Sequence, residues 1–255
     1  MKTISYNQYR SIHSFNGRIR FLVFHYTAVD FAGSIAALTG PSVSAHYLVP
    51  DITDPSYQRA GHSTQEVFGL VDETQRAWHA GISQWGNRSN LNDTSIGVEI
   101  VNMATFKDGL FNFPPYHPEQ IRAIEELALN ILARYPDIGP TQVLGHSDIA
   151  IGRKSDPGPK FPWYALYLKG VGAWYDEDTR NRFLQQFTES GIPSRADLLQ
   201  QFKTYGYDTS RATDEAGYRQ LVRAFQLHFR PQACEGEMDA QTAANLAALV
   251  AKYFP

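Results

Sequence analysis

The apolar residues in the first two-thirds of the chain fall into short runs that polar segments separate. Most runs are rich in β-branched and aromatic residues, which is typical of buried strands. One run alternates strictly: Ile96, Val98 and Ile100 share one face of the expected strand. Gly97 and Glu99 share the other face. We expect five strands, over residues 18–27, 44–50, 66–72, 95–102 and 142–146.

Helical patterns lie between these strands. The clearest covers residues 118–135, where apolar residues recur at helical spacing. Pro118 suits the first helical position, Glu119 favours the positive end of the helix dipole, and Pro136 ends the run. A shorter helix is expected over residues 31–39. Strands that alternate with covering helices predict an α/β fold with a mixed central β-sheet flanked by helices.

The pattern changes in the last third of the chain. A charged stretch is followed by a boundary at Gly191 and Pro193, and then by three amphipathic helical patterns. Three such helices predict a small bundle, and this bundle holds no cluster of catalytic residue types. We therefore expect a catalytic domain over residues 1–178, a linker over residues 179–192 and a small three-helix binding domain over residues 193–255.

The composition narrows the classes of function. Of the 255 residues, 43% are hydrophobic and 19% are charged, which is ordinary for a globular protein. The net charge of −3 gives no strong attraction to nucleic acid or anionic membranes. No apolar run is long enough to predict a membrane span, and the first ten residues lack the apolar stretch of a secretory signal. The single cysteine, Cys234, excludes an internal disulfide.

Residues 145–159 combine three kinds of chemistry in a segment stiffened by prolines. His146 offers an imidazole, Lys154 an ammonium group and Asp156 a carboxylate. His25 ends an apolar strand far upstream and can complete the set. Two neutral imidazoles and one carboxylate suit Zn²⁺ and leave a fourth position open, which is the pattern of a catalytic site with one zinc ion per chain. A histidine on an apolar strand is also often a core residue without a metal, and the residues alone leave this alternative open.

A zinc hydrolase also needs a base and a group that stabilises negative charge. Glu99 is the best candidate for the base, because it lies on the strand face opposite the apolar stripe. A solvent-facing strand residue is the alternative. Lys154 is either a solvated loop charge or a cation that stabilises the oxyanion of a tetrahedral intermediate. The chain has no His-Glu-x-x-His motif, no Gly-x-Ser-x-Gly elbow and no phosphate loop.

Six segments, taken together and in order, carry a resemblance to a known family. The chain resembles the zinc-dependent N-acetylmuramoyl-L-alanine amidases of the AmpD and AmiD kind, which share a fold with phage T7 lysozyme and peptidoglycan recognition proteins. The resemblance covers roughly residues 18–175. The matching segments are residues 24–28 (FHYTA), 43–49 (VSAHYLV), 77–81 (AWHAG), 91–99 (LNDTSIGVE), 145–148 (GHSD) and 153–159 (RKSDPGP).

This resemblance implies a role for each candidate residue. It implies that His25, His146 and Asp156 are the zinc ligands. It further implies that Glu99 is the catalytic glutamate and that Lys154 faces the oxyanion.

The resemblance extends to substrate contacts and to the C-terminal region. Trp78, His79 and Asn92 sit in motifs that line the substrate cleft of the family, whereas His46 is by the same comparison a structural strand residue. The C-terminal region resembles the three-helix peptidoglycan-binding module of AmiD-like enzymes. Its matching segments are residues 224–226 (AFQ) and 236–242 (GEMDAQT).

The implied activity is hydrolysis of the amide between the lactyl group of N-acetylmuramic acid and L-alanine of the stem peptide. The implied partners are peptidoglycan and muropeptides, with no nucleic acid, and a homo-oligomer stays open. Two alternatives remain: a recognition protein of the same fold that binds muropeptides without cleaving them, and a cytoplasmic amidase that recycles anhydro-muropeptides. The C-terminal module indicates the periplasm or cell envelope, while the absent signal leaves the cytoplasm open.

Overall fold

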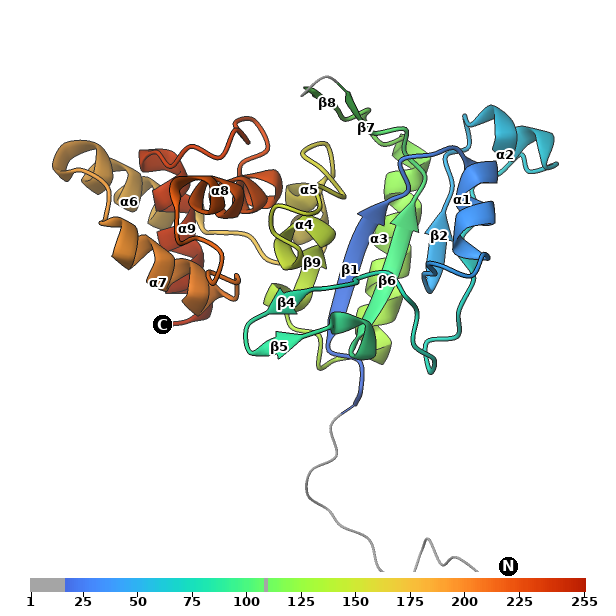
Figure 1. Cartoon of the computed structure of the whole chain (residues 1–255), viewed down its shortest axis with the longest axis horizontal. Coiled ribbons are helices and arrows are strands. Elements are labelled where there is room, and N and C mark those ends of the chain that lie inside the picture. The colour runs from blue at the N-terminus through green and yellow to red at the C-terminus, as the bar shows by residue number, and fades with distance from the viewer. Residues whose placement is uncertain (1–16, 108–109) are drawn as a thin grey trace, which may run out of the picture.

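A five-stranded sheet forms the centre of the N-terminal half of the protein (Figure 1). The computed structural model describes residues 17–107 and 110–255, so the start of the chain, with its expected lack of a signal, lies outside the described residues. The strand order is β3-β2-β6-β1-β9, and all pairs are parallel except β2 with β3, which confirms a mixed sheet. The strands are β1 (Phe21–Tyr26), β2 (Tyr47–Val49), β3 (Phe68–Gly69), β6 (Ser95–Ile100) and β9 (Val143–Gly145).

The two longest strands form where the apolar pattern is strongest. Strands β1 and β6 pair along their whole length, and Leu22, Ile96 and Val98 are fully buried between the sheet and its covering helix. Strand β3 is much shorter than the predicted run of residues 66–72, because only Phe68–Gly69 pairs with β2 at the sheet edge. An edge strand has a hydrogen-bonded neighbour on one side only, which limits the ladder that the sequence can form.

Helix α3 (Pro118–Arg134) lies along the sheet behind β1 and β6 (Figure 1), close to the predicted bounds. A capping box starts it: the His117 ring accepts from the amide of Glu119, and the Gln120 side chain accepts from the amide of His117. Its apolar stripe joins the core of the sheet. The other helices of this half are α1 (Phe31–Leu38), α2 (Pro55–Arg59), α4 (His146–Ile149), α5 (Trp163–Leu168) and the 3-10 turns η1 (Leu91–Asp93) and η2 (Pro140–Gln142).

Two short hairpins extend from this half and leave no signal in the apolar pattern. One pairs β4 (Gln84–Trp85) with β5 (Arg88–Ser89), and the other pairs β7 (Thr105–Lys107) with β8 (Leu110–Asn112). Strands of two or three residues are too short to show an alternation.

Helices alone build the C-terminal part, as predicted, but they begin earlier than expected. The predicted linker over residues 179–192 falls almost entirely within α6, because Phe183 and Phe187 form an apolar stripe and α6 packs against α9. None of the described helices has the length and apolar character that crossing a membrane requires. The helices are α6 (Glu177–Ser190), α7 (Arg195–Tyr205), α8 (Glu215–Phe229) and α9 (Ala240–Tyr253).

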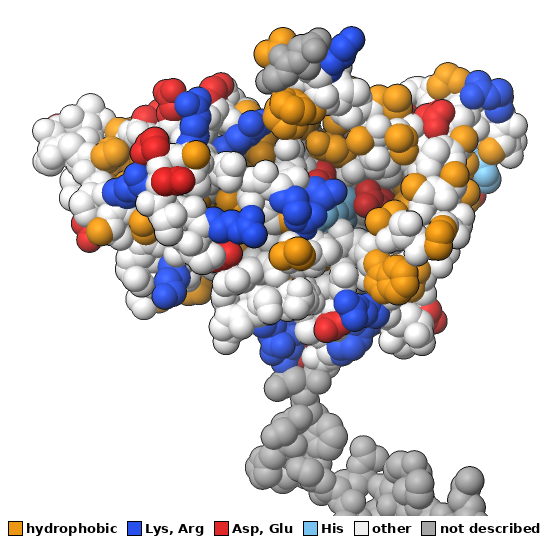
Figure 2. All heavy atoms as spheres, in the orientation of Figure 1, with side chains coloured by type: hydrophobic (Ala, Val, Ile, Leu, Met, Phe, Trp, Pro, Cys, Tyr) orange, Lys and Arg blue, Asp and Glu red, His pale blue; other side chains and the backbone are white. Residues whose placement is uncertain are grey.

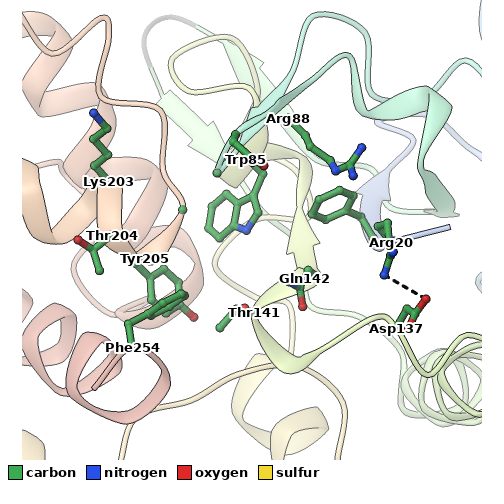
Figure 3. A pocket seen from close by; sticks show the side chains of 14 residues that line it. Arg20, Trp85, Arg88, Asp137, Thr141, Gln142, Lys203, Thr204, Tyr205 and Phe254 are labelled. Carbon is green, nitrogen blue, oxygen red and sulfur yellow. Dashed lines mark ion pairs between the residues drawn. The ribbon is translucent and has the colours of Figure 1, made fainter. Parts of the chain in front are cut away.

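The two halves share one hydrophobic core, which runs from the sheet into the C-terminal helices. At one contact, Trp85 points toward Tyr205 (Figure 3), with ring centroids 5.9 Å apart and nearly perpendicular planes. The amide of Gly86 donates to the carbonyl of Gly206 over 2.7 Å. Gly206 has a φ of +134°, and a Cβ there would lie 2.6 Å from the Trp85 ring. Glycine therefore allows the hairpin and helix α7 to meet this closely.

Candidate active site

Three buried side chains meet near the carboxyl end of the parallel strands. His25 lies in β1, His146 opens α4 directly after β9, and Asp156 follows in the next loop. Nδ1 of His25 lies 2.9 Å from Nδ1 of His146 and 3.0 Å from Oδ2 of Asp156. Nδ1 of His146 and Oδ2 of Asp156 are also 3.0 Å apart. The three residues are only 1%, 3% and 4% exposed, and their donor atoms form a group that could hold a metal ion.

Hydrogen bonds behind His25 determine which of its ring nitrogens carries the proton. The hydroxyl of Ser95 donates to the carbonyl of Leu91 over 2.6 Å, so its oxygen accepts from Nε2 of His79 at 3.1 Å. His79 then presents the lone pair of its Nδ1 to Nε2 of His25, 2.9 Å away. His25 therefore donates from Nε2 and keeps a lone pair on Nδ1.

His146 reaches the same state through a different acceptor. Its Nε2 lies 3.0 Å from the carbonyl oxygen of Ala80, which can only accept. The Arg153 guanidinium is farther from Nε2, at 3.4 Å, and donates to the same carbonyl over 2.9 Å. The closer contact assigns the proton to Nε2, so Nδ1 also keeps a lone pair. Two imidazole lone pairs and an oxygen of Asp156 thus face one another with no proton between them. Such a group repels itself unless a cation lies among its members, and two histidines with one carboxylate suit Zn²⁺. The residues present fit a metal ion.

Glu99 stands beside this group on the neighbouring strand. The parallel register pairs it with His25, on the same face of the sheet. Its Oε2 is buried and has no hydrogen-bond partner among the residues that the structure describes. Burial raises the pKa of Glu99 to about 8; the Asp156 charge adds to the shift and the Lys154 charge opposes it. A carboxyl group with a pKa near neutrality can both accept and release a proton, as a general base must.

Gly97 and Asn92 hold the segment that lies behind the metal-binding group. A Cβ at Gly97 would lie 2.3 Å from Cγ of His79, so only glycine lets this ring lie against β6. Oδ1 of Asn92 accepts from the amides of His79 and Ala80, at 3.1 and 2.7 Å. These contacts fix both partners that set the protonation of the two imidazoles.

A cavity of about 190 Å³ opens onto this group. Figure 2 shows a hollow on this side of the molecule in which histidine and acidic side chains are visible among hydrophobic ones. Lys154 is exposed at the cavity, which places an ammonium group close to the buried acids. The predicted residues that line the cavity are Trp78, His79, Glu99, His146, Lys154 and Asp156.

Comparison with known proteins places this geometry in a family. The family model described as N-acetylmuramoyl-L-alanine amidase matches residues 15–159, more than half of the chain. The chain belongs to this amidase family. The amidase is 45% identical over 237 residues to the N-acetylmuramoyl-L-alanine amidase AmiD of Escherichia coli K12, which covers 92% of this chain and 84% of AmiD.

Solved structures agree with this assignment. The crystal structure of AmpDh3 from Pseudomonas aeruginosa superposes on the amidase with a TM-score of 0.96 and 56% sequence identity, over 99% of both chains. Escherichia coli AmiD, in complex with the substrate anhydro-N-acetylmuramic acid-L-Ala-D-γ-Glu-L-Lys, gives a TM-score of 0.85 and 43% identity over 96% of this chain and 93% of AmiD. Both likenesses extend through the C-terminal helices, which the family model does not cover.

Burial keeps His25 in the neutral state that metal binding needs. Burial, reinforced by the neighbouring His146, lowers the pKa of His25 to about 4, so this imidazole is neutral at pH 7. Burial also holds the pKa of His79 well below its usual value. The imidazoles of His25 and His79 are therefore both neutral at pH 7.

The residues expected to contact substrate fall in three different environments. Trp78 is 54% exposed and stands free at the cavity. His79 lines the cavity, but both of its ring nitrogens face protein groups. Asn92 is buried and does not line the cavity, because its side chain holds backbone amides instead. His46 accepts from the amide of Gly97 at 3.0 Å, a structural position as predicted.

A second buried carboxylate, Asp148, lies in the matching segment 145–148, but its role is not among those that the sequence predicts. It lies two residues after His146 and is fully buried. Its Oδ1 accepts from the hydroxyl of Tyr207 at 2.7 Å, and its Oδ2 accepts from Nδ1 of His228 at 2.8 Å and from the amide of Gly145 at 2.7 Å. Two of these donors come from the C-terminal helices and their loops. Asp148 therefore ties that part of the chain to the helix that begins with His146.

Proposed function

We propose that this amidase hydrolyses the amide between the lactyl group of N-acetylmuramic acid and L-alanine of the stem peptide, using one zinc ion held by His25, His146 and Asp156. The observation that carries the proposal is the convergence of three candidate ligand atoms beside an exposed lysine and a carboxyl group, one oxygen of which has no partner among the described residues. The substrate bound to AmiD, a relative of the same fold that aligns with 96% of this chain, supports the same class of substrate here.

Each residue of the cavity has a chemical task in this reaction. A zinc ion, when bound, would act as a Lewis acid that polarises the carbonyl and activates a water molecule. Glu99 takes the proton of the attacking water and later delivers it to the leaving nitrogen of L-alanine. Lys154 faces the negative charge that develops on the carbonyl oxygen. Trp78 offers an exposed aromatic face to the substrate at the cavity.

We further propose that helices α6–α9 hold peptidoglycan and that the enzyme acts on the polymer in the cell envelope. These helices lie outside the residues that the family model matches, and they add no ionisable group to the catalytic cavity. Asp148 receives two of its hydrogen bonds from this part, so deleting it would disturb the active site. Pelleting of the full-length, inactive Glu99→Gln variant with intact sacculi is therefore the appropriate test. Failure to pellet would contradict a polymer-binding role.

The proposed activity is tested by release of stem peptides from purified sacculi. Wild-type protein should release them, a chelator should abolish release, and added zinc should restore it. Glu99→Gln should lose release while keeping its zinc, because this carboxyl group is no ligand in the proposal. The matched control is Glu126→Gln on the exposed side of α3, which should behave as wild type.

The same assay separates the alternatives. A recognition protein would bind muropeptides and release no peptide with zinc present. A recycling amidase would cleave soluble anhydro-muropeptides and leave sacculi intact. Full activity in Glu99→Gln would contradict the general-base assignment.

A further inference from the structure

A second cavity, of about 480 Å³, lies between the two halves of the amidase. Helix α5 forms one wall, and it stands between the central sheet and α8 in Figure 1. The segment Trp174–Glu177 and the chain that follows α8 form the rest, including Pro231 and Gln232. No residue that lines this cavity also lines the catalytic one. The cavity is therefore a separate place on the molecule where a ligand can bind.

Aromatic side chains dominate its lining. Tyr164 is 46% exposed, and its ring centroid lies 5.4 Å from that of Trp174, which lies 5.0 Å from that of Tyr175. The exposed aromatic face of Tyr164 can pack against the C–H face of a pyranose ring, and the polar tips of such residues can hydrogen-bond its hydroxyls.

The cavity also contains a buried ring nitrogen without a partner. His228 is 2% exposed and lines the cavity, and its ring stacks on Trp163 with centroids 3.7 Å apart. Nδ1 of His228 is occupied, because it donates to Asp148. Nε2 is buried and has no hydrogen-bond partner in the described part of the chain. Buried polar atoms are rarely left unpaired, so this nitrogen is suited to a ligand hydroxyl or amide.

The charged side chains that line the cavity favour a ligand without negative charge. Glu177 is the carboxylate among the lining residues, and neither lysine nor arginine is among them. A stem peptide carries free carboxylates and would find no cation here to pair with them. An N-acetylated sugar has hydroxyl and amide groups but no charge, and it matches both the aromatic faces and the unpaired nitrogen.

We infer that this cavity binds an N-acetylhexosamine unit of the glycan strand, with its ring against Tyr164 and Trp174 and a polar group at Nε2 of His228. The inference rests on the proposed function, because it names the part of peptidoglycan that the C-terminal half holds.

The test uses the full-length protein and tetra-N-acetylchitotetraose, a neutral sugar without any bond that the amidase cleaves. Binding is followed by the fluorescence of the tryptophans at the cavity. Wild type should bind the sugar, and Tyr164→Ala should weaken binding by about tenfold or more, since it removes the exposed aromatic face. Leu168→Ala is the matched control, because Leu168 is on the same helix, is 62% exposed and does not line the cavity. Its affinity should equal that of wild type.

A second variant guards against the possibility that Tyr164→Ala loses sugar binding only because it misfolds. Gln232 is exposed on the segment after α8, so Gln232→Ala should fold normally and should also weaken sugar binding. Absence of sugar binding by wild type, or unchanged binding in both variants, overturns the inference. Tighter binding of a free stem peptide than of the sugar would overturn the ligand class. If wild type releases stem peptides but does not bind the sugar, only this inference is refuted. If wild type binds the sugar but releases no stem peptide, only the proposed activity is refuted.

Discussion

Two buried carboxylates on the segment after β9 differ in how their oxygens are satisfied. Every oxygen of Asp148 accepts a hydrogen bond, from Tyr207, His228 and the amide of Gly145. Asp156 is buried almost as deeply, but its Oδ2 faces two ring nitrogens that have no proton to give, because those of His25 and His146 are donated elsewhere. The two carboxylates therefore differ in whether their neighbours donate protons to them, and their similar burial does not reveal this difference.

This difference separates a structural acid from a functional one. A buried carboxylate is costly unless charges or donors compensate it, and Asp148 has its compensation within the fold. Asp156 lacks it until a cation is bound. The same rule separates the residues around them. Asn92 and His46 hold backbone groups, whereas one oxygen of Glu99 has no partner among the residues that the structure describes.

The contrast predicts that two matched substitutions destabilise the metal-free protein by different amounts. Asp148→Ala leaves three buried donors unpaired and should lower the free energy of unfolding by about 3–5 kcal/mol. Asp156→Ala removes one member of a group of mutually repelling lone pairs, and its cost should be less than half as large. Urea denaturation of both variants measures the two losses.

The exposed Asp178→Asn serves as the baseline for these unfolding experiments, with no change expected. Equal losses for the two alanine variants would contradict the distinction between the two carboxylates. Zinc addition should then stabilise the Asp148 variant more than the Asp156 variant, since only the former keeps all three proposed ligands.

The pH dependence of stability should report on Glu99. Its folded-state pKa of about 8 lies above the ordinary value of 4.5, so the folded protein holds this proton more tightly than the unfolded chain does. The resulting stabilisation is fully present below the unfolded value and is lost as the pH rises through about 8. Metal-free Glu99→Gln should escape that loss and should exceed wild type near pH 9, by a few kcal/mol at most. Unfolding free energies that fall equally in both proteins between about pH 6 and about pH 9 would count against the raised pKa.

The smallest effect is expected behind the metal ligands. Ser95→Ala removes the acceptor that orients His79, so the proton on Nε2 of His25 is less well defined. Groups that orient a metal ligand in this way typically change affinity by about 10–100-fold, and we expect about tenfold weaker zinc binding here. Competition with a chromogenic chelator measures it. Ser89→Ala, on the exposed β5 strand, is the control. Unchanged affinity in Ser95→Ala would mean that the hydrogen-bond chain does not set the ligand state.

The fold was predictable wherever apolar periodicity was long. Strands β1 and β6 and helix α3 follow directly from it, and the face of β6 that carries Gly97 and Glu99 follows from strict alternation. The β4–β5 and β7–β8 hairpins are too short to leave a pattern. The sequence predicts a linker over most of helix α6, because charged residues obscure its short apolar stripe. That stripe includes Phe183 and Phe187, and α6 packs against α9.

The site was predictable to the level of residue type. Motifs in the sequence indicate His25, His146 and Asp156, and the fold brings these three together. The choice of Nδ1 over Nε2 depends on Ser95 and on the carbonyl of Ala80, which come from other elements. The links from Asp148 to Tyr207 and His228 join positions 59 and 80 residues apart, and no local pattern reports such contacts.

The central claim is that one zinc ion is held by three particular atoms. A crystal structure of the zinc-loaded protein, with anomalous scattering measured at the zinc edge, tests it most directly. The account predicts a single zinc at distances of about 2.0–2.2 Å from Nδ1 of His25, Nδ1 of His146 and an oxygen of Asp156, with Nε2 of His25 still facing His79. A zinc ion bound through Nε2 of either histidine, or bound by His79 in place of one of these residues, would contradict it.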